Sequence, residues 1–307
     1  MTNSVLGGLC LLGWLLLTAC ESQQKEDNDK LVILATTGMI GDAVKNIVGD
    51  SADVEVLMGP GTDPHLYKMS QGDLHKLTKA DIIIYNGLYL EGKMGEVLQS
   101  MEKQKPVTAF VNGIAQEKLR NVSGFAGGYD PHVWFSIELW KDGVAYVSRK
   151  IIEADPARAS FYQANTQAYI DSLNQLEEWV RAEISRIPES QRVLITAHDA
   201  FGYFGDAYGI TVEGLQGIST VSEPGLKDII RITDLIVERK IKSIFVETSV
   251  SEKTVRSVLE GAAAKGQKVT IGGTLYSDAL GDETSDADTY IGMVRENVRT
   301  IVRALED

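Results

Sequence analysis

Short apolar runs alternate with longer amphipathic stretches along most of this chain, and this pattern restricts the possible folds more than any other feature. In the first half the short runs occupy residues 31–37, 54–58, 82–85 and 107–110, with helical periodicity at stretches such as 40–48 and 91–101. Short apolar runs are typical of buried strands, and the amphipathic stretches are typical of helices that cover a sheet. This alternation predicts a parallel sheet flanked by helices.

The same alternation returns in the second half. Strands are predicted at residues 193–196, 210–215, 243–246 and 268–271, and helices at 224–239, 252–264 and 286–305. Between the halves, residues 156–187 carry apolar side chains at helical spacing, begin at a proline and end before Pro188. A single helix there would extend about 45 Å. We therefore predict an α/β protein of two lobes, each with a parallel sheet flanked by helices, joined by one long backbone helix. Two shorter helices with a kink between them are the alternative.

The N-terminus has the pattern of an export signal. Residues 5–17 form an apolar run without charge, followed by Leu17-Thr18-Ala19-Cys20 and a polar stretch. A membrane-spanning helix needs about 20 apolar residues, so this shorter run is typical of a lipoprotein signal peptide, although residues 1–4 lack the usual Lys or Arg. An uncleaved anchor or a misassigned start is the alternative.

These patterns divide the chain into five expected segments and predict a membrane-anchored protein outside the cytoplasm. The segments are a signal peptide (1–19), a tether that begins at the lipid-bearing Cys20 (20–29), an N-terminal lobe (30–155), a linking helix (156–187) and a C-terminal lobe (188–307).

Cysteine content and charge exclude several classes of function. Only Cys10 and Cys20 occur, so cleavage before Cys20 leaves one cysteine, which bears the lipid; neither a disulfide nor a zinc–thiolate site is then possible. The chain has 30 Lys and Arg against 43 Asp and Glu, a formal charge of −13. Nucleic-acid phosphates require a basic surface, so nucleic acid is not expected as a partner.

Three of the four histidines lie in similar surroundings, each after an apolar strand or a loop rich in Gly and Pro. They are His65 and His132, both preceded by Asp-Pro, and His198, which directly follows a predicted strand. Asp278 lies just past the strand at 268–271. Residues beyond the carboxyl ends of parallel strands gather at one edge of a sheet, so these four can converge, two from each lobe. Three imidazoles and one carboxylate suit Zn²⁺, Mn²⁺ or Fe²⁺ rather than Ca²⁺ or Mg²⁺. The sequence therefore predicts a transition-metal site in the cleft between the lobes.

Other polar residues are weaker candidates for the metal site. His75 lies in a predicted helix capped by Ser70, and we expect it on a solvated face. Asp199 either caps the helix that follows it, which we favour, or accepts a hydrogen bond from an imidazole. Glu247, at the end of a strand, either closes the cleft or forms a surface salt bridge. The aromatic residues after His132 and His198 are expected mainly in the core, with some of them shielding the metal from water.

Several motifs resemble one known family, the metal-specific solute-binding proteins of ABC importers that are joined by a rigid backbone helix. The resemblance covers the chain from residue 31 onward, and it rests on Gly59-Pro60-Gly61-Thr62-Asp63-Pro64-His65, Tyr85-Asn86-Gly87-Leu88, Asp130-Pro131-His132-Val133-Trp134, Ala197-His198-Asp199-Ala200-Phe201-Gly202-Tyr203-Phe204 and Ser277-Asp278-Ala279-Leu280-Gly281.

This resemblance implies that His65, His132, His198 and Asp278 hold the metal. It also implies a monomer that delivers its ion to an importer permease and the associated ATPase. Manganese-specific members generally have Glu in place of His198, and zinc-specific members often have a long His-rich loop; this chain has neither. The expected cargo is Zn²⁺ or Mn²⁺ or both, with Fe²⁺ also possible.

Two other functions are possible for a chain of this kind, a metallohydrolase and a surface adhesin. A metallohydrolase needs an open coordination position and a general base, whereas four protein ligands leave little room for an activated water. No His-Glu-x-x-His motif occurs. A surface adhesin fits the lipid anchor, but adhesion does not require four metal-binding side chains at strand ends. We therefore expect a binding protein and not an enzyme.

Overall fold

A four-stranded parallel sheet forms the centre of the N-terminal lobe in the computed structural model, which describes residues 30–306. The strand order is β2-β1-β3-β4. In this sheet Ile33 of β1 pairs with both Val54 of β2 and Ile82 of β3. The strands are β1 (Leu31–Ala35), β2 (Ala52–Val56), β3 (Ile82–Tyr85) and β4 (Val107–Ala109), and the helices around them are α1 (Gly38–Val48), α2 (Gln71–Lys79), α3 (Lys93–Met101) and α4 (Ile137–Ala154). The expected signal peptide, Cys20 and tether lie outside the described residues.

The C-terminal lobe contains two parallel strand pairs, β5 with β6 and β7 with β8. β5 lies beside β7, but within residues 30–306 no ladder of backbone hydrogen bonds joins them. The named strands of residues 30–306 pair only in parallel, as predicted. The strands are β5 (Val193–His198), β6 (Thr211–Gln216), β7 (Ser243–Glu247) and β8 (Thr270–Leu275), and the helices are α6 (Gly202–Tyr208), α7 (Leu226–Arg239), α8 (Lys253–Ala264) and α9 (Tyr290–Leu305).

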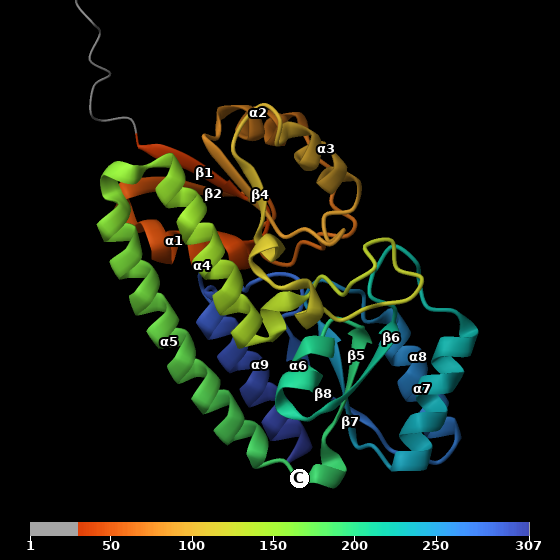
Figure 1. Cartoon of the computed structure of the whole chain (residues 1–307). Helices are drawn as coiled ribbons and strands as arrows, with labels where there is room; N and C mark the ends of the chain where they lie inside the picture. The colour runs from red at the N-terminus through yellow and green to blue at the C-terminus, as the bar shows by residue number, and fades with distance from the viewer. Residues whose placement is uncertain (1–29, 307) are drawn as a thin grey trace, which may run out of the picture.

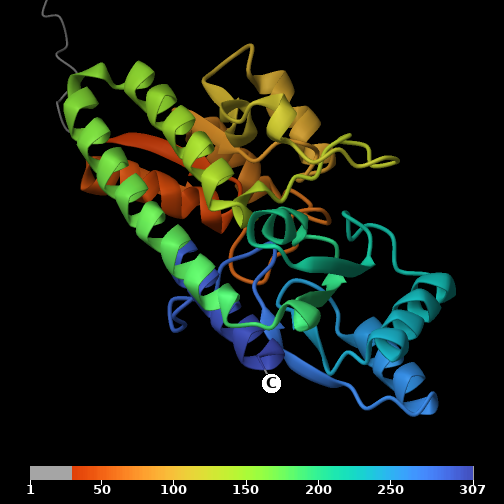
Figure 2. The same ribbon diagram turned by 60° about the horizontal axis from the view of Figure 1, so that its bottom comes forward.

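One long helix, α5 (Ala159–Ser185), runs along the side of both lobes (Figures 1 and 2). A short 3-10 turn, Pro156–Arg158, leads into it, and its 27 residues extend about 40 Å. It packs against α1 and α4 of the N-terminal lobe and α9 of the C-terminal lobe. The buried side chains along it include Tyr162, Tyr169, Leu173, Leu176 and Val180. The prediction of one continuous linking helix is confirmed.

Helix α4 was not predicted from the sequence. Its buried side chains include Ile137, Trp140, Val144, Val147 and Ile151, which follow helical spacing, and Ser136 caps its N-terminus by accepting a hydrogen bond from the backbone N–H of Leu139 (3.4 Å). The aromatic residues near its start, Trp134, Phe135 and Trp140, indicated core packing but no helical period. They belong to the core, as expected.

The largest hydrophobic core crosses the boundary between the lobes. It extends from the first sheet through α4 and α5 to α9, and a second cluster fills the space between β5, β7, α7 and α8. The two lobes are therefore joined by packing in a shared core as well as by the segment of chain that connects them. Among residues 30–306, no helix is long and apolar enough to cross a membrane.

Candidate metal site

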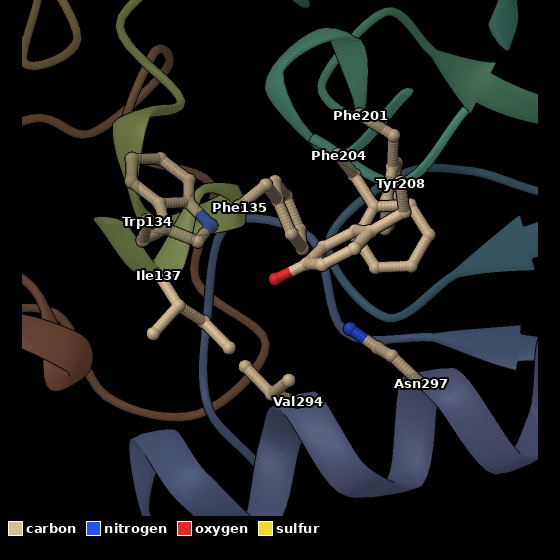
Figure 3. Close-up of a pocket in the computed structure, with 8 residues that line it drawn as sticks. All are labelled: Trp134, Phe135, Ile137, Phe201, Phe204, Tyr208, Val294 and Asn297. Atoms are coloured by element: carbon tan, nitrogen blue, oxygen red, sulfur yellow. The ribbon is translucent and has the colours of Figure 1, made fainter. Parts of the chain in front are cut away.

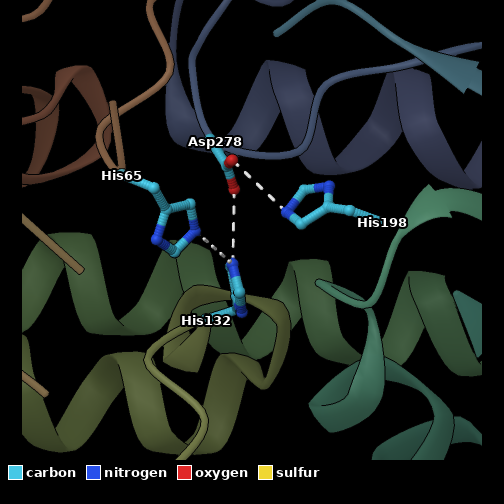
Figure 4. A group of neighbouring side chains, drawn as sticks. All are labelled: His65, His132, His198 and Asp278. Carbon is cyan, nitrogen blue, oxygen red and sulfur yellow. Dashed lines mark hydrogen bonds and ion pairs between the residues drawn. The ribbon is translucent and has the colours of Figure 1, made fainter. Parts of the chain in front are cut away.

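Four side chains meet between the lobes: His65, His132, His198 and Asp278 (Figure 4). One donor atom from each lies within 4.8 Å of the donors of the other three. The His65 and His132 Nε2 atoms are 3.4 Å apart, and Asp278 lies 3.5 Å from His132 Nε2 through Oδ1 and 3.3 Å from His198 Nε2 through Oδ2. The most exposed of the four, His65, retains only 7% of its accessible surface. The convergence predicted from strand ends is therefore observed.

Each lobe supplies two of these side chains from loops or strand ends. His65 follows β2 in a loop where the carboxylate of Asp63 accepts a hydrogen bond from the His65 backbone N–H (2.9 Å). His132 directly precedes the 3-10 turn Val133–Phe135. His198 is the last residue of β5, and Asp278 follows β8.

The imidazole of His132 is oriented by Asp130, two residues before it. Oδ1 of this fully buried carboxylate accepts hydrogen bonds from the His132 backbone N–H (2.9 Å) and from its ring Nδ1–H (2.7 Å). A proton held on Nδ1 leaves the Nε2 lone pair facing the other three donors. The Asp-Pro-His motif is visible in the sequence, but this role of Asp130 was not predicted from it.

The imidazole of His198 is oriented in the same way by Glu247, the last residue of β7. Glu247 accepts hydrogen bonds from the His198 backbone N–H (2.9 Å) and from its ring Nδ1–H (2.5 Å). Glu247 is buried, so the surface salt bridge expected as one alternative is wrong, whereas a role in closing the cleft stays a prediction. The favoured role of Asp199 is also wrong, because Phe201 occupies the N-cap of α6 and no side chain caps it. The role of Glu247 could have been suspected from the sequence, because Glu247 ends one predicted strand and His198 follows another.

The loop that carries Asp278 is fastened from two directions. The Trp134 indole Nε1–H donates to the carbonyl of Ser277 (2.9 Å), and Asn297 of α9 bonds both the N–H and the carbonyl of Tyr276 (2.9 and 2.8 Å). The predicted strand end at residue 271 is too early, because β8 continues to Leu275. As a result, Gly272 and Gly273 lie within the strand and not in the Asp278 loop.

His75 lies outside the cluster, on the exposed side of α2. Ser70 and Asp73 form a reciprocal capping box at the start of this helix. This placement confirms the sequence-based separation of His75 from the other three histidines.

Burial and charge give the four donors different proton affinities. Burial lowers the pKa of His65 to about 3, so that its ring is neutral near pH 7. For His198, burial opposes protonation, but the carboxylates of Glu247 and Asp278 raise the pKa well above its ordinary value. Burial by itself would raise the pKa of Asp278, yet the imidazoles, His198 first among them, lower it below its ordinary range. The site therefore stabilises a negative carboxylate that faces positive charge.

Three atoms of the cluster are left without hydrogen-bond partners. Both carboxylate oxygens of Asp278 and Nε2 of His198 are buried and form no hydrogen bond of normal geometry within residues 30–306; their nearest polar contacts are the ion-pair distances of 3.3 and 3.5 Å among Asp278, His198 and His132. Buried polar atoms are normally paired, and a charged one is costly when it is not. A cation bound between these atoms would satisfy all three.

Aromatic side chains close the site on one side. The Trp134 ring lies 5.2 Å from that of His132, and Phe135 stacks on Phe201 at 4.1 Å. Beside them lies a small cavity, lined also by residues of α6 and α9, with a volume of only about 10 Å³ (Figure 3). Such a cavity holds about one water molecule and no organic ligand. Trp134 thus shields the site, whereas Phe135 and Phe201 belong mainly to the core.

Comparison with known proteins gives matches over nearly the whole chain. Residues 33–304 match the family model for zinc-uptake complex component A, periplasmic (ZnuA). The manganese-binding lipoprotein MntA of Bacillus subtilis is 49% identical over 94% of this chain and 95% of its own length. The zinc-binding protein TroA of Treponema pallidum is 41% identical over 96% and 97%. A solved structure of periplasmic zinc-binding TroA from T. pallidum superimposes with a TM-score of 0.87 and covers 90% of this chain and 99% of its own, at 42% identity. With its motifs, fold and buried cluster in agreement with these matches, this chain belongs to the ZnuA family of metal-binding solute-binding proteins.

Proposed function

We propose that this protein captures Zn²⁺ or Mn²⁺ between its lobes and delivers the ion to an ABC importer. The observation that carries this proposal is the buried cluster of His65, His132, His198 and Asp278 with its unpaired donor atoms. In a tetrahedral site with bonds of about 2.1 Å, neighbouring donors are about 3.4 Å apart. Three donor pairs here lie 3.3 to 3.5 Å apart, two of them through different oxygens of Asp278, and all four donors lie within 4.8 Å of one another. The donors are therefore spaced to surround a single small ion.

The donor set is compatible with both metals. Three imidazoles favour zinc over manganese in the Irving–Williams order, whereas selectivity in cells also depends on geometry and supply. Asp278 faces His132 with one oxygen and His198 with the other, so both oxygens are available to one ion. Such a bidentate carboxylate would provide the additional ligand that a larger ion such as Mn²⁺ accepts. The names of MntA and TroA, manganese-binding and zinc-binding, support both choices.

The proposal extends to location and partners. We infer a lipoprotein anchored through Cys20, with a signal peptide (1–19), a tether (20–29), two lobes (30–155 and 188–307) and a linking helix (156–187). The relatives named as lipoproteins support this location, and the name of a manganese ABC transporter substrate-binding lipoprotein of Streptococcus pneumoniae supports an importer as partner. A permease, its ATPase and a monomeric binding protein are the inferred components.

Family membership argues for a binding protein in preference to an enzyme or an adhesin. The ZnuA family comprises solute-binding transport proteins. A hydrolase would need a coordination position open to water, and an adhesin would need no buried donor cluster.

Thermal unfolding tests the metal proposal. The chain from Lys30 onward is stripped with a chelator and then melted with Zn²⁺, Mn²⁺ or Mg²⁺. A ligand that binds only the folded state at 100 times its Kd adds about 2.7 kcal/mol to the free energy of unfolding, so zinc and manganese should each raise the Tm while magnesium should not. An unchanged Tm with both transition metals would refute the proposal, and competition between them would rank the two affinities.

A further inference from the structure

Asp130, which orients His132, is a buried carboxylate with one unsatisfied oxygen. Its Oδ1 accepts both hydrogen bonds from His132, whereas Oδ2 has no hydrogen-bond partner among the described residues. A buried charge is tolerated only when other charges or donors compensate it. The group that faces Oδ2 therefore affects how firmly Asp130 holds the imidazole.

That group is the guanidinium of Arg120, whose Nε lies 3.6 Å from Asp130 Oδ2. The two residues also pair through their backbones, because the N–H of Asp130 donates to the carbonyl of Arg120 (2.9 Å). Arg120 and Asp130 thus form the base of one closed loop of the N-terminal lobe. The Arg120 side chain is 35% exposed, whereas that of Asp130 is fully buried.

The same arginine joins this loop to the C-terminal lobe. Its Nη1 donates to Asp206 of α6 (2.5 Å). Tyr203 of α6 accepts a hydrogen bond from the Arg120 backbone N–H (3.0 Å) and donates one to the Asp130 carbonyl (2.9 Å). Helix α6 follows closely after His198, so Arg120 connects the surroundings of two histidines from opposite lobes.

Gly202, the first residue of α6, gives this pair its space. A Cβ at Gly202 would lie 2.6 Å from Arg120 Nε and 2.9 Å from Asp130 Oδ2, closer than real contacts allow. The guanidinium and the carboxylate are therefore packed directly over the backbone of α6. An arginine in a solvated surface ion pair would not need to approach the backbone at Gly202 so closely.

We propose that Arg120 is a positioning residue for metal binding, which holds Asp130 and through it the His132 imidazole. This inference rests on the proposed function, since its effect is read as metal affinity. Without the guanidinium, Asp130 Oδ2 faces no compensating charge. The free energy of the buried carboxylate would then be lower in an orientation turned away from His132. Loss of partners that orient metal ligands lowers affinity about 10–100-fold, and Arg120 acts one step further out, so we expect a loss of about tenfold.

The test compares Arg120→Gln with Arg181→Gln in the full chain. Arg181 also reaches α6, where it donates to the carbonyl of Ala207 (3.1 Å), and it pairs with the buried Glu177 (2.5 Å). Within residues 30–306 it makes no hydrogen bond or ion pair with a histidine of the cluster. Zinc affinity is measured by competition with a chromophoric chelator, and the visible spectrum of the Co²⁺-loaded protein reports ligand geometry. Arg120→Gln should weaken zinc binding about tenfold and change the cobalt spectrum. Arg181→Gln should alter only the Tm.

A double substitution separates positioning from general destabilisation. In an Asp130→Asn background the buried charge is gone, so Arg120→Gln should add less than about a twofold further loss. Arg120→Lys retains the positive charge but not the planar guanidinium, so it should bind zinc with an intermediate affinity. If Arg120→Gln does not fold, this variant provides the test in its place. Wild-type affinity in Arg120→Gln and Arg120→Lys, or a full additional loss in the Asp130→Asn background, would overturn the inference. Failure of the wild-type chain to bind zinc would instead refute the proposed function.

Discussion

His132 and His198 come from opposite lobes but are held in the same way. Each histidine gives its backbone N–H and its ring Nδ1–H to one buried carboxylate, Asp130 in the N-terminal lobe and Glu247 in the C-terminal lobe. The difference is the distance along the chain, because Asp130 precedes its histidine by two residues and Glu247 lies on a neighbouring strand, 49 residues away. The same two histidine donors are thus satisfied once in a tight turn, by one oxygen of Asp130, and once through strand packing, by both oxygens of Glu247.

This difference shows two ways to secure a metal ligand. A turn such as Asp130-Pro131-His132 depends on local backbone conformation, which proline restricts. The pair of His198 and Glu247 depends on the side-by-side placement of β5 and β7, which no backbone ladder joins in the described residues. At their ends the carboxylate contacts link the two strand pairs. Stability of the C-terminal lobe and orientation of its histidine are therefore coupled.

The largest expected effect comes from removal of either histidine. His132→Ala or His198→Ala should weaken zinc binding by more than about 100-fold, since a direct ligand contributes more than the partners that orient it. Isothermal titration or chelator competition measures the loss. His75→Ala, which removes an exposed histidine from α2, is the control and should bind like the wild type. Equal losses in all three variants would contradict the assignment of ligands.

Substitution of the two carboxylates tests the comparison itself. Asp130→Asn and Glu247→Gln keep the side-chain shape but remove the charge, and each should lower zinc affinity about 10–100-fold. Only Glu247→Gln should also lower the Tm of the metal-free protein markedly, because it weakens the contact between β5 and β7. Chelator competition and calorimetry provide the two measurements. Similar Tm changes in both variants would show that the turn and the strand contact are equivalent for stability.

The pH dependence of affinity should reflect the raised pKa of His198. Below that pKa the metal-free ring carries a proton on Nε2 as well as on Nδ1, and the metal ion must displace the proton on Nε2 to bind there. Zinc affinity should therefore fall about tenfold per pH unit as the pH decreases through the neutral range. Glu247→Gln removes one cause of the raised pKa, so its affinity should begin to fall at a lower pH. Affinity that does not change between about pH 6 and 8 would contradict this account.

The smallest expected effect is a change of overall shape. Helix α5 bonds to both lobes, through Asn165 to the carbonyl of Ile47 in α1 (3.0 Å) and through Glu177 to Tyr208 in α6 (2.9 Å). Wide hinge motion would break such contacts along a continuous helix. Solution scattering should give nearly the same radius of gyration, about 19 Å for a compact chain of this size, with and without metal. A large compaction on loading would refute the rigid-helix model and leave the ligand assignment intact.

Much of the fold could be predicted because its signals are local. Buried strands such as 82–85 and the helix that follows Pro156 are visible as apolar runs and helical spacing. Helix α4 was missed because its residues follow a cluster of aromatic side chains that suggested core packing without a period. The end of β8 was placed too early because Gly272 and Gly273 suggest a loop. In the structure these glycines allow α9 to approach, since a Cβ at Gly273 would lie 2.4 Å from Thr300.

In the site, too, the residues with local signals could be predicted and those that depend on tertiary contacts could not. The four donors could be proposed because strand ends meet at one edge of a sheet, and two Asp-Pro-His motifs mark two of them. Glu247 and Arg120 could not be assigned, because their roles depend on which strands and loops lie side by side. Asp199 was assigned to a cap because Asp before a helix is a common cap, but here the helix begins three residues later, at Gly202.

The order of the donors along the chain also has a consequence for folding. Of the four donors, His65 and His132 precede the linking helix, so a nascent chain that ends before α5 carries only two of the four ligands. The remaining donors follow β5 and β8, and Asp278 depends on α9, the last helix, through Asn297. Tight binding therefore arises only after the whole chain has folded. A metal ion in the compartment of synthesis therefore cannot bind tightly to the unfinished chain. The metal that occupies the site is selected from the solution in which folding is completed.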